Sequence, residues 1–148
     1  MKCLVIGLGN FGKMLAGRLT NAGHEVIGVD VDERRVDDVK DRISVAYIMD
    51  ATESKALRAL PFDELDCVVI AIGGSMDDSL RTVLAVRPLA KKRLYVRVVD
   101  EAHGAVLGAM GVEGAFYPEG FAAWLFADGI ARGDVSDYIY KEISSQLH

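Results

Sequence analysis

Cysteine, proline and tryptophan are scarce in this sequence, which has 2 Cys, 3 Pro and 1 Trp among 148 residues. Cys3 and Cys67 both lie inside apolar runs, and no histidine or cysteine stands near either of them at the spacing of metal ligands. A disulfide framework and a zinc site are therefore poorly supported. The expected compartment is the cytoplasm, where thiols stay reduced.

Long hydrophobic runs and long basic runs are also missing. The apolar stretch Cys3–Ile6 is interrupted at once by Gly7, Gly9 and Asn10, so we expect no signal peptide, and no apolar run approaches the length of a membrane span. The formal net charge is −5, and basic residues occur only in short groups such as Lys91–Arg93. We expect no nucleic-acid partner and no direct membrane insertion, so that any membrane role depends on a partner.

Short apolar runs alternate with helical patterns along the chain. Strands are predicted over Met1–Ile6, Glu25–Val29, Ser44–Met49, Asp66–Ile72, Arg93–Val98 and Gly114–Tyr117. Helices are predicted over Phe11–Ala22, Asp32–Asp41, Glu53–Leu60, Ser75–Leu89, Glu101–Met110, Glu119–Ile130 and Val135–Leu147. The sequence thus predicts an α/β fold: a Rossmann-type doubly wound parallel sheet of order 3-2-1-4-5-6 in a single domain over residues 1–130, with a C-terminal helical extension over residues 131–148.

A glycine-rich motif, Gly7-Leu8-Gly9-Asn10-Phe11-Gly12, follows the first predicted strand and opens the first helix. This is the context that the dinucleotide fingerprint requires. Gly7 permits a tight turn, Gly9 lets the backbone approach a pyrophosphate, and Gly12 lets the helix pack close to the sheet. The motif predicts a nucleotide site at the positive end of the helix dipole. The alternative is a Rossmann-type sheet that has lost its ligand.

An acid stands at the end of the second predicted strand. Asp30 lies 18 residues after Gly12, near the spacing of about 20 at which an acid binds a ribose hydroxyl. A carboxylate there repels a 2′-phosphate, which favours NAD or an adenosine nucleotide over NADP. Arg34 and Arg35 offer the opposite interpretation, because an arginine near that ribose can hold a 2′-phosphate. They can equally be exposed residues in the first turns of a helix capped by Asp32.

Two further segments fall at the carboxyl edge of the predicted sheet, where such folds bind ligands. Asp50-Ala51-Thr52 follows the third strand, and Ile72-Gly73-Gly74 ends the fourth. Each has a purely structural alternative. Asp50 can be the N-cap of the following short helix, and the two glycines can be required by a turn.

Together these residues resemble the KTN/RCK (TrkA-N) family of nucleotide-binding regulators of potassium channels and transporters. The matching stretches are Val5–Gly12, Gly23–Asp30, Asp50–Glu53, Val68–Gly73 and Tyr117–Glu119, and the similarity covers about residues 1–130. The resemblance implies a cytoplasmic regulatory subunit that binds NAD(H), ATP, ADP or AMP and gates a potassium channel or transporter of the Trk/Ktr type. It also implies a homo-oligomer, either a dimer or a ring, that grips a membrane pore subunit.

The resemblance also implies roles for individual residues. Asp30 would hold the adenosine ribose, and Asp50-Ala51-Thr52 would contact the adenine. The edge of the fourth strand would contribute Ile72, Gly73 and Ser75, and Arg97 would reach the phosphates. Glu119 would help to bind Mg²⁺ or Ca²⁺ between subunits, although an acid at a helix start is also a usual partner of the helix dipole.

The sequence departs from the family pattern in two places. Asn10 stands where ATP-responsive members often have an arginine that reaches the terminal phosphates, which puts sensing of a γ-phosphate in doubt. Members also commonly carry a second, C-terminal ligand domain, and 148 residues leave no space for one. Ligands of that domain, such as cyclic di-AMP, are not expected.

The last helices usually cross to a neighbouring subunit in this family. Phe121, Trp124, Leu125 and Phe126 concentrate apolar area on one predicted helix, which suits either an interface or packing against the chain's own sheet. Beyond Gly133, the segment that carries Tyr138, Tyr140, Ile143 and Leu147 continues the apolar content, so swapping or docking is plausible.

The rival functions are a small NAD-dependent oxidoreductase and an NAD(H)-binding redox sensor. An oxidoreductase usually takes its proton-transfer group from a substrate domain, for which this chain lacks the length. His24, His103 and His148 are each expected to be solvated, and Cys3 and Cys67 to lie at the edge opposite the ligand site as small hydrophobes. Asp77 and Asp78 suit the first turn of a helix. No residues form a catalytic set, so the sequence predicts a protein that is not an enzyme.

Overall fold

The computed structural model describes residues 1–133, 135, 141, 144 and 145. The chain divides into two compact units, Met1–Phe116 and Tyr117–His148, which are described separately. The helix predicted over Val135–Leu147, with Tyr138, Tyr140, Ile143 and Leu147, falls largely outside the described residues.

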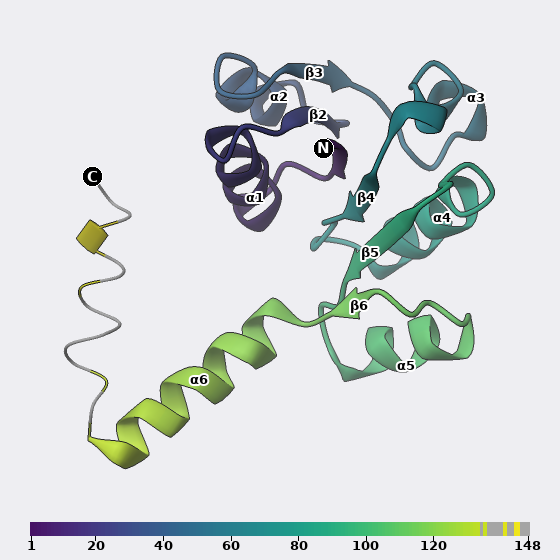
Figure 1. The fold of residues 1–148 in the computed structure, drawn as a ribbon. Helices are drawn as coiled ribbons and strands as arrows, with labels where there is room; N and C mark the ends of the chain where they lie inside the picture. The colour runs from purple at the N-terminus through teal and green to yellow at the C-terminus, as the bar shows by residue number, and fades with distance from the viewer. Residues whose placement is uncertain (134, 136–140, 142–143, 146–148) are drawn as a thin grey trace. The chain divides into compact units, whose positions relative to one another are not determined.

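The first unit contains a parallel sheet of six strands among the described residues. Its strands are β1 (Lys2–Ile6), β2 (Glu25–Asp30), β3 (Val45–Ile48), β4 (Cys67–Ile70), β5 (Arg93–Arg97) and β6 (Ala115–Phe116), joined in the order β3-β2-β1-β4-β5-β6. This order confirms the predicted doubly wound topology (Figure 1). All four residues of β4 are buried, as its uninterrupted apolar sequence indicates.

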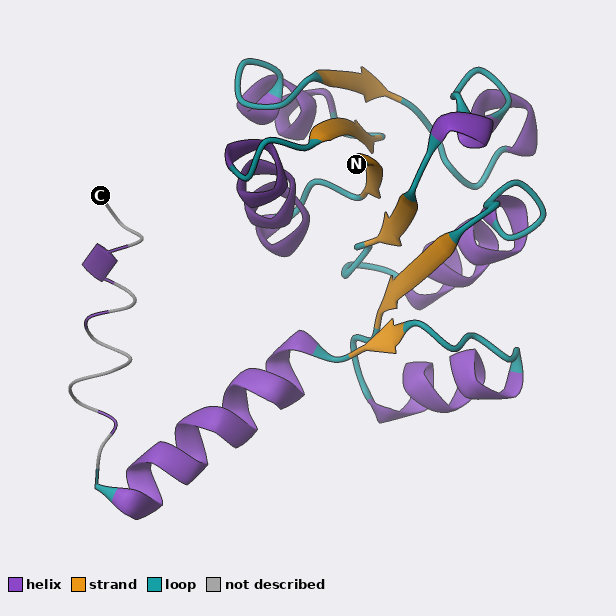
Figure 2. Cartoon of the chain, in the orientation of Figure 1, coloured by secondary structure: helices purple, strands orange, loops and turns teal. Residues whose placement is uncertain are grey.

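Helices connect the strands in the first unit. They are α1 (Asn10–Asn21), α2 (Glu33–Val39), α3 (Ser54–Leu57), α4 (Met76–Val86) and α5 (Glu101–Ala109), with a short 3₁₀ turn, η1 (Phe62–Glu64), before β4. Figure 2 shows this regular alternation of helix and strand. The predicted fourth helix, Ser75–Leu89, is too long at its end: α4 ends at Val86, because Pro88 has no N–H to continue the helical hydrogen bonds. The turn η1 was not predicted.

Two apolar clusters lie on the two faces of the sheet, and the alternation of side chains along each strand separates them. In β1, Leu4 and Ile6 belong to the larger cluster, which includes residues of α3, α4 and α5. Cys3 and Val5 belong to the other, which includes residues of α1 and α2. Both faces of the central strands are therefore covered by helices, so that their carboxyl ends are the open edge of the sheet.

His103 corrects one prediction. It was expected to be solvated, yet it lies in α5 with no exposed surface. Its Nδ1 accepts a bond from the Val99 N–H at 3.2 Å, so the neutral ring carries its proton on Nε2, which lies 3.2 Å from the Ser79 Oγ of α4. His103 thus joins α5 to α4 and is a structural residue.

The second unit contains α6 (Pro118–Arg132), which ends at Gly133 with a φ of +74°. None of the residues of α6, all of which the structure describes, is buried. Its large apolar side chains are exposed, from 41% for Leu125 to 65% for Phe121. No helix among the described residues is long and apolar enough to cross a bilayer.

Candidate functional site

The glycine motif forms the turn between β1 and α1. Gly7 has a φ of +94°, which suits glycine, and its N–H donates to the carbonyl of Val29 on β2 at 2.9 Å. A Cβ at Gly12 would collide with the Gly7 carbonyl oxygen, so only glycine lets α1 approach the turn so closely. The structural tasks predicted for Gly7 and Gly12 are therefore those that the fold requires.

The start of α1 suits an anion. Gly9 is the N-cap and supplies no side-chain oxygen, and the first turn, which lies wholly within the described residues, contains no acid. Among the described residues, no atom lies within 4 Å of a Cβ built at Gly9. The first N–H groups of α1 and the positive end of its dipole thus lie beside open space, where a phosphate can approach the backbone.

Asp30 holds the glycine turn in place. The residue is buried, with 6% of its surface exposed. Its Oδ2 accepts from the Leu8 N–H at 2.7 Å and its Oδ1 from the Asp32 N–H at 2.9 Å. A carboxylate has about four acceptor positions, so these bonds leave capacity for a ribose hydroxyl. Sequence reasoning missed this positioning role, although an acid that directly follows a buried strand is a signal for it.

The two arginines of α2 differ from each other. Arg34 is exposed, and its N–H donates to the Oδ1 of Asp32, the predicted N-cap, at 2.9 Å. Arg35 places Nη1 at 3.6 Å from Asp30 Oδ2. Its side chain is 54% exposed, so the pair contributes little to stability, at most about 1 kcal/mol. Arg35 therefore lies beside the acid expected to bind the ribose, whereas Arg34 faces solvent.

Asp50 follows β3, next to the end of β2. Its Oδ1 accepts from Thr52 Oγ1 at 2.6 Å and from the Thr52 N–H at 3.0 Å, and these bonds hold the pKa of the Asp50 carboxyl below its usual range. The N-cap of α3 is Glu53, so the alternative of Asp50 as a helix cap is wrong. The chain instead forms a tight turn at Asp50–Glu53, closed by a 3.2 Å backbone bond. Ala51 in this turn is buried.

Gly73, Arg97 and Phe11 meet between the ends of β1, β4 and β5. A Cβ at Gly73 would lie 2.5 Å from Arg97 Nη1, and the Arg97 guanidinium carbon is 5.6 Å from the centre of the Phe11 ring. Phe11 also contacts the ring of Phe116 at 5.5 Å. Gly73 has no positive φ, so the backbone of the turn does not require glycine there. The missing Cβ instead leaves room for the Arg97 guanidinium. A basic group thus lies beside the glycine turn.

Ile72 and Ser75 lie in the loop between β4 and α4, at the same edge of the sheet. Ser75 is the N-cap of α4, with Oγ accepting from the Asp78 N–H at 3.1 Å. Asp77 pairs with Arg81 at 2.8 Å, as expected for an acid in a first helical turn. Ser75 thus has a structural role as a helix cap, and its expected contact with a ligand stays a prediction.

Glu119 lies in the first turn of α6, in the second unit. Its expected role in binding metal between subunits stays a prediction. Among the described residues, no group of three or more His, Cys, Asp or Glu side chains could hold a metal ion. The first unit brings together the glycine turn, Asp30, Gly73 and Arg97, which suit the binding of a nucleotide. They do not provide a nucleophile with a neighbouring base.

Comparison with known proteins agrees with this geometry. Residues 3–118 match the TrkA-N domain family. The Ktr system potassium uptake protein C of Bacillus subtilis (strain 168) is 33% identical over 135 residues, which cover 91% of this chain and 61% of that protein. The chain thus spans about three-fifths of the length of this curated relative.

Solved structures show the same fold. The NAD(P)-binding domain of an exopolyphosphatase-related protein from Archaeoglobus fulgidus matches with a TM-score of 0.76 and 25% identity, over 88% of this chain and 97% of that one. A GsuK channel bound to NAD matches with a TM-score of 0.66 and 18% identity, over 79% of this chain and 21% of that one. With a family match from residue 3 to residue 118 and a parallel sheet of the predicted order, this chain belongs to the TrkA-N domain family.

Proposed function

We propose that this chain is a nucleotide-binding regulatory domain of a potassium-uptake system. The observation that carries the proposal is the start of α1, which lacks a side-chain cap and an acid and lies beside open space at Gly9. Asp30 and Arg97 supply a ribose acceptor and a cation near it. The ligand is an adenine nucleotide, NAD(H), ATP, ADP or AMP, with the diphosphate or phosphate at the glycine turn.

The similar proteins support the proposal. The relative from Bacillus subtilis is a potassium uptake protein, the domain from Archaeoglobus fulgidus is NAD(P)-binding, and the GsuK channel was solved with NAD. In this chain the nucleotide acts as a signal and is not converted. The domain has two conformations, and the nucleotide favours the one that it binds more tightly. A membrane pore subunit at the cytoplasmic face receives that change of conformation.

Assembly of several copies belongs to the same proposal. The exposed apolar side chains of α6, among them Phe121, Trp124 and Ile130, form an area that suits a protein interface. We expect a dimer or a larger ring of this chain. Light scattering after size exclusion should report at least twice the mass of the 16.0 kDa chain, and a monomer at micromolar concentration would contradict this part of the proposal.

Calorimetry with a single substitution tests nucleotide binding. Gly9 has a φ of −66°, which alanine also adopts, and the new Cβ would point into open space. Gly9→Ala should therefore fold normally but fill part of the space that a phosphate needs. The affinity for the best of NADH, ATP, ADP and AMP should fall about tenfold or more, which corresponds to about 1.4 kcal/mol.

Gly17→Ala is the matched control. Gly17 lies on the same helix, and among the described residues nothing lies within 4 Å of its built Cβ. This variant should bind like the wild type. Equal affinity of Gly9→Ala and wild type would contradict the placement of the phosphate, and no heat from the wild type with any of the four nucleotides would contradict the proposal as a whole.

A further inference from the structure

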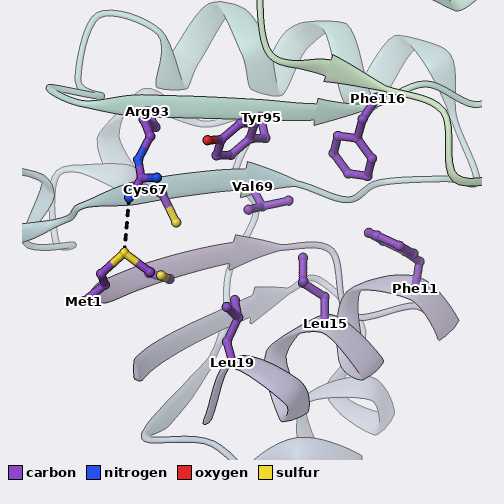
Figure 3. A pocket seen from close by; sticks show the side chains of 10 residues that line it. Met1, Phe11, Leu15, Leu19, Cys67, Val69, Arg93, Tyr95 and Phe116 are labelled. Atoms are coloured by element: carbon purple, nitrogen blue, oxygen red, sulfur yellow. Dashed lines mark hydrogen bonds between the residues drawn. The ribbon is translucent and has the colours of Figure 1, made fainter. Parts of the chain in front are cut away.

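A cavity lies on the sheet face that carries α1. Its volume is about 280 Å³. Leu15 and Leu19 of α1 form one wall, and side chains of β4, β5 and β6 form the other (Figure 3). The lining is almost entirely apolar, with Arg93 and Tyr95 as its polar side chains among the described residues. Such a cavity offers little to a hard cation or a polar metabolite.

The cavity also contains sulfur. Cys3 and Cys67, the only cysteines of the sequence, are direct partners on the neighbouring parallel strands β1 and β4. Partners on parallel strands direct their side chains to the same face of the sheet. Both cysteines line the cavity, together with Met1. In Figure 3 the Cys67 thiol and the Met1 thioether lie at the same end of the cavity, beside Arg93.

These sulfur atoms lie in an unusual electrostatic setting. Arg93 Nη2 donates to Met1 Sδ at 3.1 Å, which keeps a positive charge near the two thiols. Burial, followed by the neighbouring Cys3 thiol, raises the pKa of Cys67 to about 12, whereas Arg93 acts in the opposite direction. Without a ligand, Cys67 is therefore a protonated and unreactive thiol at neutral pH.

We propose that Cys3, Cys67 and Met1 form a binding site for a soft monovalent cation, copper(I). Thiolate and thioether ligands select copper(I) over harder ions, and this ion accepts two or three ligands, whereas a structural zinc site needs four. The binding step exchanges protons for metal: Cu⁺ and two thiols give a bis-thiolate copper complex of charge −1 and release two protons. The Arg93 guanidinium offsets that negative charge.

The proposal requires that affinity rise with pH. Two protons leave as the metal binds, so the apparent affinity increases as the solution becomes more alkaline, until the free thiols lose their protons. A site made of the nearby Met1 amine and His24 Nδ1, which lie 3.4 Å apart, would use nitrogen ligands and would not depend on the cysteines. These two nitrogen groups are the alternative copper site in this region, and substitution of His24 distinguishes that site from the cysteine site.

Competition against bathocuproine disulfonate, with reduced protein under anaerobic conditions, measures the affinity for copper(I) directly. The wild type should bind one copper(I) per chain and show an ultraviolet thiolate-to-copper band. Cys67→Ala should lose the band and weaken copper(I) binding by at least about 100-fold. Removal of a residue that only supports a metal ligand costs up to about 100-fold, so loss of a ligand itself should cost at least as much. His24→Ala should bind like the wild type. Equal affinity of Cys67→Ala and wild type, or a large loss in His24→Ala, would overturn the proposal.

A second measurement needs no variant, in case Cys67→Ala fails to fold. X-ray absorption of the copper-loaded wild type should show a first shell of two or three sulfur atoms and no nitrogen. A shell that contains nitrogen or oxygen would contradict the site.

Discussion

Two helices that begin at the same edge of the sheet begin in opposite ways. α1 follows β1 and starts at Gly9 with neither a side-chain cap nor an acid in its first turn. α4 follows the adjacent strand β4 and starts at Ser75, whose Oγ caps the Asp78 N–H, with Asp77 and Asp78 in the first turn. A side chain of the protein thus satisfies one backbone donor at the start of α4, whereas no side chain caps the start of α1, whose donors are left to water or to a ligand.

The capped start of α4 contributes to the stability of the fold, whereas the uncapped start of α1 is available for binding. A helix start with an N-cap contributes about 1 kcal/mol to stability, and α1 forgoes that contribution. Two other features offset this loss of stability at α1. Gly12 lets the helix pack against the turn, and Asp30 accepts a hydrogen bond from the Leu8 N–H. The start of α1 is therefore rigid but chemically unsatisfied, and substitutions at the two helices should act in different ways.

The largest effect is expected at Gly12. The Cβ of Gly12→Ala would collide with the Gly7 carbonyl oxygen, which belongs to the backbone and cannot rotate away. The free energy of unfolding should fall by about 3 kcal/mol or more, as for severe overpacking. Urea denaturation monitored by circular dichroism measures the change. Gly17→Ala on the same helix should instead stabilise by about 0.5–1 kcal/mol, and a similar loss in both variants would contradict the steric explanation.

Asp30→Ala should have the next largest effect. It leaves the buried Leu8 N–H without its acceptor and frees the turn that presents Gly9. The free energy of unfolding should fall by about 2 kcal/mol, and the affinity for an adenosine nucleotide should fall by a further 1–3 kcal/mol, about the contribution of a hydrogen bond to a charged group. Denaturation and calorimetry on the same preparation separate the two losses. An unchanged affinity would remove Asp30 from the nucleotide site.

Ser75→Ala tests the capped helix. It removes the acceptor for the Asp78 N–H and should lower the free energy of unfolding by about 1 kcal/mol, the usual cost of losing an N-cap. Calorimetry decides whether Ser75 also contacts the nucleotide. If the capping role is the whole of its contribution, nucleotide affinity stays the same; a clear loss of affinity would weaken the contrast between α1 and α4.

The smallest effect concerns pH and the contact between α4 and α5. Burial lowers the pKa of His103, only partly opposed by the charge of Asp100. Below the ordinary histidine pKa of about 6.5, the unfolded chain binds a proton that the folded chain does not. Stability should therefore be complete above that pH and fall as the pH drops towards the lower pKa of the folded state. Denaturation at pH 7.5 and at pH 5.5 measures the change, and His103→Gln should reduce this difference.

Much of the fold was predictable from the sequence because its determinants are local. The apolar run in β4 and the glycine motif after β1 correctly predicted the strands and the nucleotide-type turn. The errors have different origins. Asp50 was offered as a helix cap, but it closes a local turn with Thr52, and Glu53 is the N-cap of α3. His103 was expected to be solvated, but α4, which is distant in the sequence, covers it.

The sequence by itself determined the order of strands and helices and the glycine turn that opens α1. These follow from periodicity, glycine and residue type, which act over a few neighbours. Only the tertiary structure decided that Asp30 holds Leu8, that Gly73 makes room for Arg97, and that Cys3 meets Cys67 in one cavity. Such contacts join residues from about 20 to more than 60 positions apart, and they exist only once parallel strands bring those positions side by side.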